Sequence, residues 1–333
     1  MIFVLLFSTF LFAVFLTQLI RSYALNNLLD IPNQRSSHHV PTPRGGGLAI
    51  VIAYFSFLAG IFFLELVALE PILIVTTSLA VVVIGFWDDH QHIAARWRFL
   101  THAVTAAVAL ILLSMWATSP INLWFFDDSW LAYVAVWFFL VWSLNLFNFM
   151  DGIDGIAGSE TVFVSISLAG FMYFVDVHLA LLALGLAFSC LGFLVWNWPP
   201  AKIFMGDVGS GFLGYTLAVL ILVCAQKDPV LIVIGLILFA VFIADATYTL
   251  AHRILDRQEW YQAHCSHAYQ FAAKQKGHRY VLVAVGLINL FWLLPIAILV
   301  FRYPQYAGLG LSMAYAPLVY VIYRIGAGKQ VGN

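Results

Sequence analysis

The sequence predicts an all-α, polytopic integral membrane protein, and two features of its composition support that fold class. Of its 333 residues, 63% are hydrophobic and 9% are charged, whereas a soluble domain carries about a quarter charged residues. Apolar stretches of about 20 residues, the length that crosses a bilayer as a helix, recur along the whole chain. We expect one membrane-embedded domain over residues 1–333, without linkers or internal repeats.

Eleven stretches are candidate membrane-spanning helices. They are Ile2 to Ile20, Gly47 to Leu69, Ile72 to Trp87, Phe99 to Ala117, Trp130 to Phe147, Ile156 to Val175, Leu179 to Trp196, Gly211 to Cys224, Val230 to Leu250, Tyr280 to Phe301 and Ala307 to Tyr323. The third and the eighth are shorter than about 20 residues, so the total depends on counting both. Because Arg21 follows the first stretch without a small-residue cleavage site, we expect a retained helix there rather than a signal peptide.

The distribution of Lys and Arg orients these spans. With eleven spans, all of the 15 Lys and Arg residues except Lys227 and Arg302 fall on one side. Cytoplasmic loops are enriched in Lys and Arg, so the N-terminus is expected outside and the C-terminus in the cytoplasm. The cytoplasmic loops would then be residues 21–46, 88–98, 148–160, 197–210 and 251–279.

Charge and cysteine content exclude two further classes. The net charge is −1 and no basic cluster alternates with aromatic residues, so we expect no nucleic-acid partner. Cys190 and Cys224 lie in predicted spans and Cys265 in a predicted cytoplasmic loop, so no disulfide framework is indicated.

Polar residues gather in the predicted cytoplasmic loops, and this is the main indication of function. The stretches are "TPRGGG" (42–47), "DDHQH" (88–92), "NFMDGIDG" (148–155), "FMGDVGSG" (204–211) and "HCSH" (264–267). Asn148, Asp151 and Asp154 are spaced at i, i+3 and i+6, which on a helix would place them over about a third of its circumference. They are predicted to face one site. Solvated loop positions or caps are the alternative, because Asp, Asn and Gly also form turns.

Asp88 and Asp89 are adjacent carboxylates at the end of a span, and they repel each other unless a cation or a proton relieves them. A helix end dipping into water is the alternative. Magnesium is typically bound by a few carboxylates together with substrate phosphate oxygens, whereas zinc requires a Cys and His ligand set that is absent around these acids. The acids therefore indicate Mg²⁺, for which Mn²⁺ is a common substitute.

Asp207 lies among glycines at the mouth of a span, and Arg44 precedes a similar glycine run. Glycines let the backbone approach a phosphate, and the N-terminus of the following helix presents unpaired N–H groups to an anion. Asp207 could then hold the metal that bridges that anion, with close helix packing as the alternative reason for the glycines. The Walker pattern is absent, so P-loop nucleotide hydrolysis is not indicated.

His264 and His267 stand three residues apart in the longest predicted cytoplasmic loop. We interpret them as protonatable donors to a diphosphate, and a zinc pair as the alternative that lacks a third ligand. Asp245 lies within the ninth span, and an acid inside the membrane indicates a functional site unless it simply pairs with Arg253.

Taken in order, the stretches "DIPNQRSSHHVPTPRGGG", "DDHQHIAARWR", "NLFNFMDGIDGIAG" and "FMGDVGSGFLG", followed by a basic loop with histidines, resemble the polyprenyl-phosphate N-acetylhexosamine-1-phosphate transferases over nearly the whole chain. The resemblance implies ten or eleven spans and a magnesium-dependent reaction at the cytoplasmic face of the bacterial inner membrane. There a sugar 1-phosphate moves from a UDP-sugar to undecaprenyl phosphate, and UMP is released.

The resemblance also distinguishes branches of that family. His264 and His267 match the outer members of the family's histidine motif, but Ser266 stands where many members have another His. This difference argues against the phospho-N-acetylmuramoyl-pentapeptide transferases of peptidoglycan synthesis, which stay as the alternative. The "RSSH" at 35–38 and the "HCSH" look more like the branch that starts O-antigen, lipopolysaccharide or other surface polysaccharides, in which the sugar is often a deoxy N-acetylhexosamine.

The predicted site residues form three groups, which are catalytic Asp88, Asp89, Asp151 and Asp154; substrate-binding Arg44, Asn148, Lys202, Gly206, Asp245, His264 and His267; and metal-binding Asp207, Asn148 and Asp151. The resemblance implies these positions by motif, except for Arg44, Lys202, Gly206 and Asp245, which are predicted from this sequence alone.

The chemistry leaves two mechanisms and one rival class open. The lipid phosphate, mostly ionised because its second pKa is about 6, attacks the sugar-linked phosphorus directly, or a carboxylate attacks first and forms a covalent intermediate. Whether the chain forms a homodimer also stays open. An ion-coupled membrane transporter is the rival, and its acids would lie near the bilayer midplane.

Overall fold

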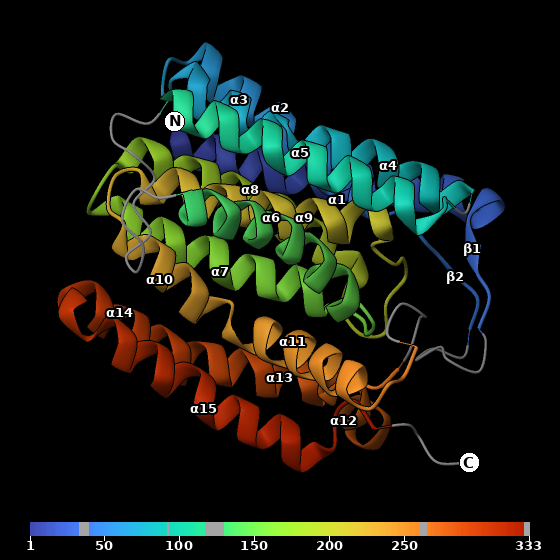
Figure 1. The fold of residues 1–333 in the computed structure, drawn as a ribbon. Helices are drawn as coiled ribbons and strands as arrows, with labels where there is room; N and C mark the ends of the chain where they lie inside the picture. Colours follow the sequence, from blue (N-terminus) through green and yellow to red (C-terminus); the bar gives the residue numbers. More distant parts are fainter. Residues whose placement is uncertain (33–39, 92, 117–129, 260–264, 330–333) are drawn as a thin grey trace.

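The structure, a computed structural model, describes residues 1–32, 40–91, 93–116, 130–259 and 265–329. Long helices run side by side along one direction (Figure 1). The first half contains α1 (Ile2–Asn27), β1 (Leu29–Asp30), β2 (Thr42–Pro43), α2 (Gly47–Phe63), α3 (Leu69–Thr76), α4 (Ser78–His90), α5 (Ala95–Trp116) and α6 (Trp130–Met150). The second half contains α7 (Ile156–Tyr173), α8 (Val177–Asn197), α9 (Asp207–Ala225), α10 (Val230–Leu238), α11 (Ala240–Leu255), α12 (Ala268–Lys276), α13 (His278–Ile288), the π-helical turn Asn289–Leu293, α14 (Leu294–Arg302) and α15 (Ala307–Ile325).

The prediction of an all-α polytopic membrane protein is confirmed. Within the described residues, nine helices are long and apolar enough to cross a membrane, or ten if α10 and α11, bent by 70° to each other, form one span. The two predicted spans that are shorter than about 20 residues in the sequence reach membrane-spanning length in the structure. Helices α3 and α4 together cover Leu69–His90, and α9 begins earlier than predicted, at Asp207. The predicted span Gly47 to Leu69 contains only the 17-residue α2. Eleven crossings therefore stay a prediction.

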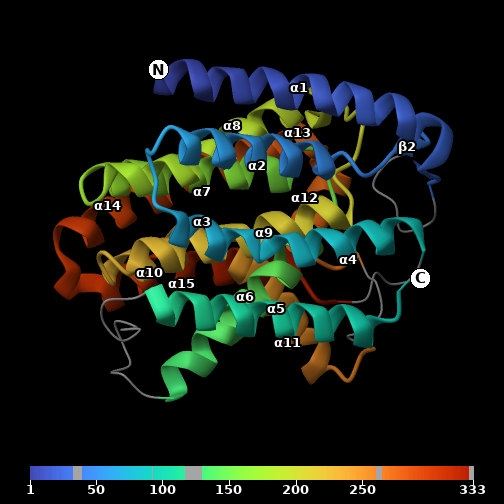
Figure 2. The same cartoon turned by 90° about the horizontal axis from the view of Figure 1, so that it is seen from above.

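Helix α9 forms the centre of the bundle. Its whole membrane-length window is buried, whereas only 22% of the corresponding window of α1 is buried. Helices α2, α4, α6 and α10 pack against α9, and the view from above shows it in the middle (Figure 2). Residues at the N-terminus of α9 are therefore positioned by several neighbouring helices at once.

Glycines permit the closest of these contacts. A Cβ on Gly47 of α2 would lie 2.2 Å from Cα of Gly209 in α9, and one on Gly85 of α4 would lie 2.9 Å from Cα of Val208. No side chain fits between backbones at that separation. The packing alternative for the glycines around Asp207 is therefore correct for Gly209.

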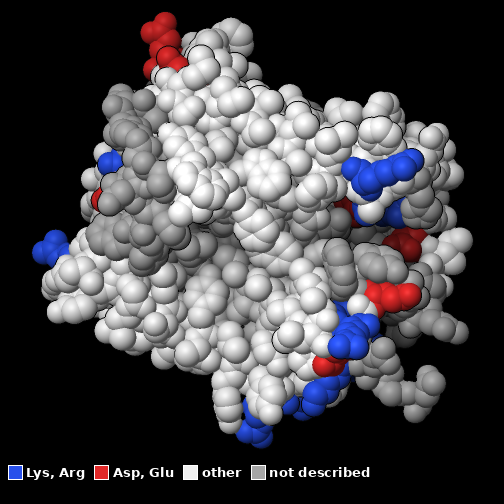
Figure 3. All heavy atoms as spheres, viewed as in Figure 1, with Lys and Arg blue, Asp and Glu red and all other residues white. Residues whose placement is uncertain are grey.

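Polar loops collect at one end of the bundle, which we name the loop end. It carries the short β1–β2 ladder, α12 and the C-terminal ends of α4 and α15, while the N-terminus lies at the other end (Figure 1). Charged side chains gather there, and the middle of the same face is almost free of them (Figure 3). That the loop end faces the cytoplasm stays a prediction.

We predict that Gly47→Ala loosens the contact between α2 and α9. The added methyl group must push two backbones apart, so the free energy of unfolding should fall by about 1–3 kcal/mol, the range for overpacked cores. Thermal unfolding of the detergent-solubilised protein measures this. Gly170→Ala is the control, because nothing lies within 4 Å of its added Cβ, and an equal loss in both variants would contradict the prediction.

Candidate active site

A polar cavity of about 260 Å³ lies at the loop end. Segments distant in the sequence form its wall. The lining residues are Asp30, Arg44, Asp89, Asn148, Asp151, Gly152, Ile153, Asp154, Asn197, Phe204, Met205, Gly206, Asp207 and Gln270. Most of the predicted site residues therefore meet around one space, although they come from the ends of different helices.

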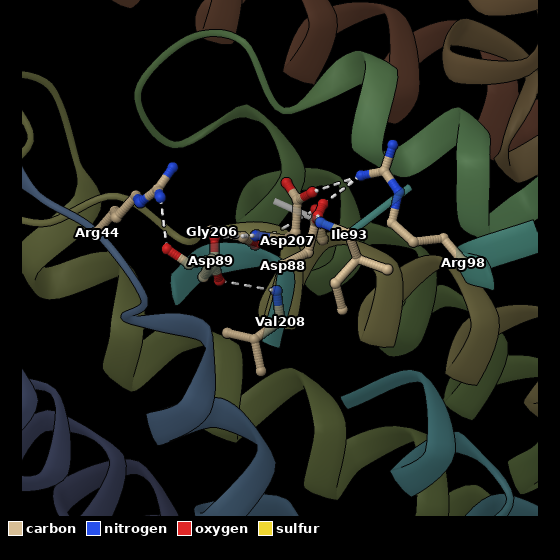
Figure 4. Close-up of polar contacts among 9 residues, drawn as sticks. Arg44, Asp88, Asp89, Ile93, Arg98, Gly206, Asp207 and Val208 are labelled. Carbon is tan, nitrogen blue, oxygen red and sulfur yellow. Dashed lines mark hydrogen bonds and ion pairs between the residues drawn. The ribbon is translucent and has the colours of Figure 1, made fainter. Parts of the chain in front are cut away.

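Asp89 holds the N-terminus of α9 in place. From the last turn of α4, its carboxylate accepts hydrogen bonds from the backbone N–H groups of Asp207 and Val208, both at 3.2 Å (Figure 4). A carboxylate in this position satisfies the first N–H groups of the helix and complements its dipole. Gly206 has a φ of +77°, and a Cβ there would lie 2.7 Å from Oδ2 of Asp89, so this position requires glycine.

The capping by Asp89 corrects one expectation. The N–H groups that follow also have partners, since Gly209 and Ser210 both donate to the carbonyl of Gly206. The N-terminus of α9 therefore presents no unpaired N–H among its first residues to a phosphate. Arg44 does line the cavity, and its Nη2 donates to the backbone carbonyl of Asp89.

Asp88 does not line the cavity and lies beside Asp207, in contact with α5 (Figure 4). Its Oδ1 accepts from the backbone N–H of Ile93 at 2.8 Å, and its Oδ2 accepts from Arg98. The same Nη1 of Arg98 donates to Oδ2 of Asp207 at 3.3 Å, so one guanidinium joins α4 and α9 (Figure 4). In the sequence, Arg98 contributed only to the predicted topology. Its position ten residues after Asp88 was the one feature that could have indicated a role at the site.

Asp151 and Asp154 lie in the loop between α6 and α7, because α6 ends at Met150. The helical spacing that predicted a shared face was therefore the wrong reason, but the loop still brings both acids to the cavity beside Asn148. A φ of +77° at Gly155 lets the chain turn into α7.

Two cross-links fix this loop against the segment that precedes α9. Asp154 accepts from the backbone N–H of Ala201 at 2.9 Å and lies 3.3 Å from Nδ1 of His278. Asn197 accepts from the N–H of Gly155 and donates to the carbonyl of Ile203, both at 2.9 Å. Asn197 and His278 were not singled out in the sequence, since neither stands in an acidic cluster.

The carboxylates around the cavity raise the free-energy cost of ionising one another. Burial, reinforced by the nearby carboxylates of Asp207, Asp89 and Asp154, raises the pKa of Asp151 well above its usual value. Such a cluster favours a hard cation with oxygen ligands. Within the described residues, no three His, Cys, Asp or Glu side chains stand close enough together to hold a metal ion by themselves.

Asp245 and His267 form a buried support rather than part of the cavity wall. His267 lies with Nδ1 3.3 Å from Oδ1 of Asp245, and Asp245 also accepts from the N–H groups of Ala268 and Tyr269, both at 3.0 Å. Arg253 donates instead to the carbonyl of Glu259, so the alternative pairing of Asp245 with Arg253 was wrong.

Helix α12, held in this way, reaches the site through two side chains. Tyr269 donates its hydroxyl to the carbonyl of Phe149 at 2.9 Å, and Gln270 lines the cavity. The sequence did not indicate Gln270. His264 lies outside the described residues. Lys202 is exposed and does not line the cavity; its Nζ lies 5.2 Å from the ring centroid of Trp196.

Comparisons with known proteins give the family of this chain. The family profile described as "Glycosyl transferase family 4" matches residues 71–225, which contain Asp88, Asp151 and Asp207. The "Probable undecaprenyl-phosphate N-acetylglucosaminyl 1-phosphate transferase" of Bacillus subtilis (strain 168) is 31% identical over 286 residues, which cover 82% of this chain and 78% of that protein.

Two further relatives are named for a different activity. The "Phospho-N-acetylmuramoyl-pentapeptide-transferase" of Wolbachia sp. subsp. Brugia malayi (strain TRS) is 31% identical over 212 residues, covering 59% of this chain and 64% of the relative. Its counterpart in Vesicomyosocius okutanii subsp. Calyptogena okutanii (strain HA) is 32% identical over 241 residues, covering 62% and 64%. The chain therefore belongs to glycosyl transferase family 4, among the polyprenyl-phosphate N-acetylhexosamine-1-phosphate transferases.

Proposed function

We propose that this enzyme transfers N-acetylhexosamine 1-phosphate, or its deoxy form, from a UDP-sugar to undecaprenyl phosphate and releases UMP. The observation that carries the proposal is the cavity at the loop end, whose wall contains Arg44 together with acids from the ends of α4, α6 and α9. The similarity to an undecaprenyl-phosphate N-acetylglucosaminyl 1-phosphate transferase supports this acceptor and an N-acetylhexosamine donor.

The reaction would take place at the cytoplasmic face of the bacterial inner membrane and start O-antigen or another surface polysaccharide. The asymmetry of Lys and Arg supports that face, since all but Lys227 and Arg302 fall on the predicted cytoplasmic side. Acids gathered at one end of the bundle also fit a reaction at the membrane surface better than a transporter, whose acids would lie near the midplane.

The donor set fits magnesium. Asp207 and Asp151 supply carboxylate oxygens and Asn148 an amide oxygen around one cavity, and burial together with the neighbouring carboxylates raises the pKa of Asp151. Magnesium commonly completes its shell with substrate phosphate oxygens. When bound, it would neutralise charge on the diphosphate as the phosphorus–oxygen bond breaks.

The protein's own groups would position the substrates. Arg44 brings a guanidinium to the cavity wall, where it can pair with phosphate oxygens. Asn148 and Gln270 add amide groups that can donate to or accept from the sugar and the nucleotide. These three residues come from separate segments of the chain, so the site depends on those segments remaining packed together.

We propose direct attack by the lipid phosphate. The two acids best placed by sequence to act on it are engaged elsewhere, because Asp89 caps α9 and Asp88 binds Ile93 and Arg98. An ionised phosphate needs little help from a base. Release of UMP without any lipid acceptor, together with a trapped labelled enzyme, would instead support the covalent route.

The pentapeptide transferases are the second candidate, because several relatives carry that name.

We predict that purified enzyme with magnesium and undecaprenyl phosphate forms a labelled lipid from UDP-N-acetylhexosamines. UDP-N-acetylmuramoyl-pentapeptide should give none. The measurement is organic extraction of label across a panel of donors, which includes the deoxy sugars. Product from the pentapeptide donor alone would overturn the proposed function in favour of the second candidate.

We predict that Asp207→Asn lowers transfer at least about 100-fold while the protein still folds. The change removes a charge at the cavity, where charge stabilises the transition state, but it keeps the side-chain shape. Labelled-lipid formation and thermal unfolding are measured together. Asp256→Asn is the matched control, since Asp256 is exposed and does not line the cavity. Near-normal transfer by the Asp207 variant would remove it from the site.

We predict that Asp151→Asn stabilises the metal-free protein. A carboxyl group with a raised folded-state pKa destabilises the fold as pH rises from its unfolded pKa of about 4, and the penalty is complete above the folded pKa. The gain in unfolding temperature over wild type should be near zero below about pH 4 and grow to about 2 °C or more at pH 8. Chelator-treated protein scanned over pH tests this, and a gain that shrinks with rising pH would contradict it.

A further inference from the structure

Among the described residues of α5, Arg98 is the one that forms ion pairs with acids of the site. Helix α5 contributes no residue to the cavity wall. The guanidinium of Arg98, with 35% of the side chain exposed, nevertheless reaches Asp88 on α4 and Asp207 on α9 through the same Nη1 (Figure 4). A single cation therefore sits between two carboxylates of different helices.

The two carboxylates are bound unequally. Asp88 is 8% exposed and has a second partner in the backbone N–H of Ile93 at 2.8 Å. Asp207 is 36% exposed, lines the cavity, and within the described residues forms an ion pair with Arg98 alone, at 3.3 Å. The contact of Arg98 with Asp207 is therefore the longer one and the one open to the cavity.

We propose that Arg98 is an internal counter-ion: it occupies the cation position of Asp207 in the resting enzyme and yields that position to a divalent cation. The inference rests on the proposed function, because Asp207 is the acid proposed to hold magnesium. A divalent ion at Oδ2 of Asp207 would stand beside the guanidinium, and like charges at that separation repel. Arg98 then keeps its contact with Asp88 and loses the one with Asp207.

Competition of this kind has a consequence for binding order. A divalent ion must displace Arg98 before it gains Asp207, so it binds the resting site more weakly than the number of acids alone would give. A nucleotide diphosphate adds negative charge beside the ion and shifts the balance in the ion's favour. Metal binding is thereby coupled to the presence of the donor.

The test measures metal binding without substrates. Full-length protein in detergent is titrated with Mn²⁺, and free Mn²⁺ is followed by electron paramagnetic resonance. Arg98→Gln should bind Mn²⁺ about tenfold more tightly than wild type, because the competing charge is gone. The matched control is Arg96→Gln, which removes the same charge from the same helix turn; Arg96 is exposed and stacks on Trp97. Its affinity should stay within about twofold of wild type.

A second measurement protects the test against misfolding. Without metal, Arg98→Gln should unfold at a lower temperature than Arg96→Gln, since Asp88 and Asp207 lose their cation, and Mn²⁺ should raise its unfolding temperature by more. Arg98→Lys, which keeps the charge, should bind Mn²⁺ like wild type or only slightly more tightly. Equal affinities in Arg98→Gln and Arg96→Gln, or weaker binding in Arg98→Gln, would overturn the counter-ion.

Asp207→Asn separates this failure from a failure of the proposed metal site. If Mn²⁺ binds that variant as it binds wild type, Asp207 is not a ligand and the metal site of the proposed function is wrong. If binding is lost with Asp207 but unchanged in Arg98→Gln, the metal site stands and only the counter-ion is rejected.

Discussion

The carboxylate of Asp89 on the first two N–H groups of α9 is the contact on which the site depends. Helix α9 is the buried centre of the bundle, so its first N–H groups, which have no acceptor within the helix, and its positive dipole end lie among other helices at the loop end. Asp89 satisfies these groups from α4, and the absence of a side chain at Gly206 gives it room. The same contact places Asp207, the first residue of the helix, at the cavity.

Burying a carboxylate in a membrane protein costs free energy, and hydrogen bonds or ion pairs can offset that cost. The carboxylates at the loop end have different roles: Asp88 and Asp89 bind backbone N–H groups or Arg98, and Asp154 ties its loop to Ala201 and His278. Asp151 and Asp207 line the cavity; burial and the nearby carboxylates raise the pKa of Asp151, and Asp207 has Arg98 as its cation. The acids that support the structure therefore position Asp151 and Asp207 at the cavity wall, and carboxylate oxygens are the ligands that a hard cation prefers.

The histidine segment shows how a motif can matter without touching the cavity. Asp245, within the bundle, accepts the N–H groups at the start of α12 and contacts His267. Through Tyr269 and Gln270 the same short helix reaches the Asp151 loop and the cavity wall. The pair of Asp245 and His267 therefore orients helix α12. The groups that this helix brings to the site are the amide of Gln270 and the hydroxyl of Tyr269, which the sequence did not indicate.

The sequence by itself determined the membrane class, the family and the acids that meet at one end, because apolar length and motif order are properties of the chain alone. Its eleven predicted spans compare with nine or ten membrane-length helices among the described residues. It could not decide which acids cap helices, cross-link loops or face the cavity. Those roles depend on contacts such as Asp89 with α9, Asn197 with Gly155 and Arg98 with Asp207, which join residues more than 40 positions apart. Only the packing of the helices at the loop end, α4, α5 and α9 as well as α7 and α8, brings such groups within hydrogen-bond distance, and hydrogen bonds depend on distance rather than on spacing along the sequence.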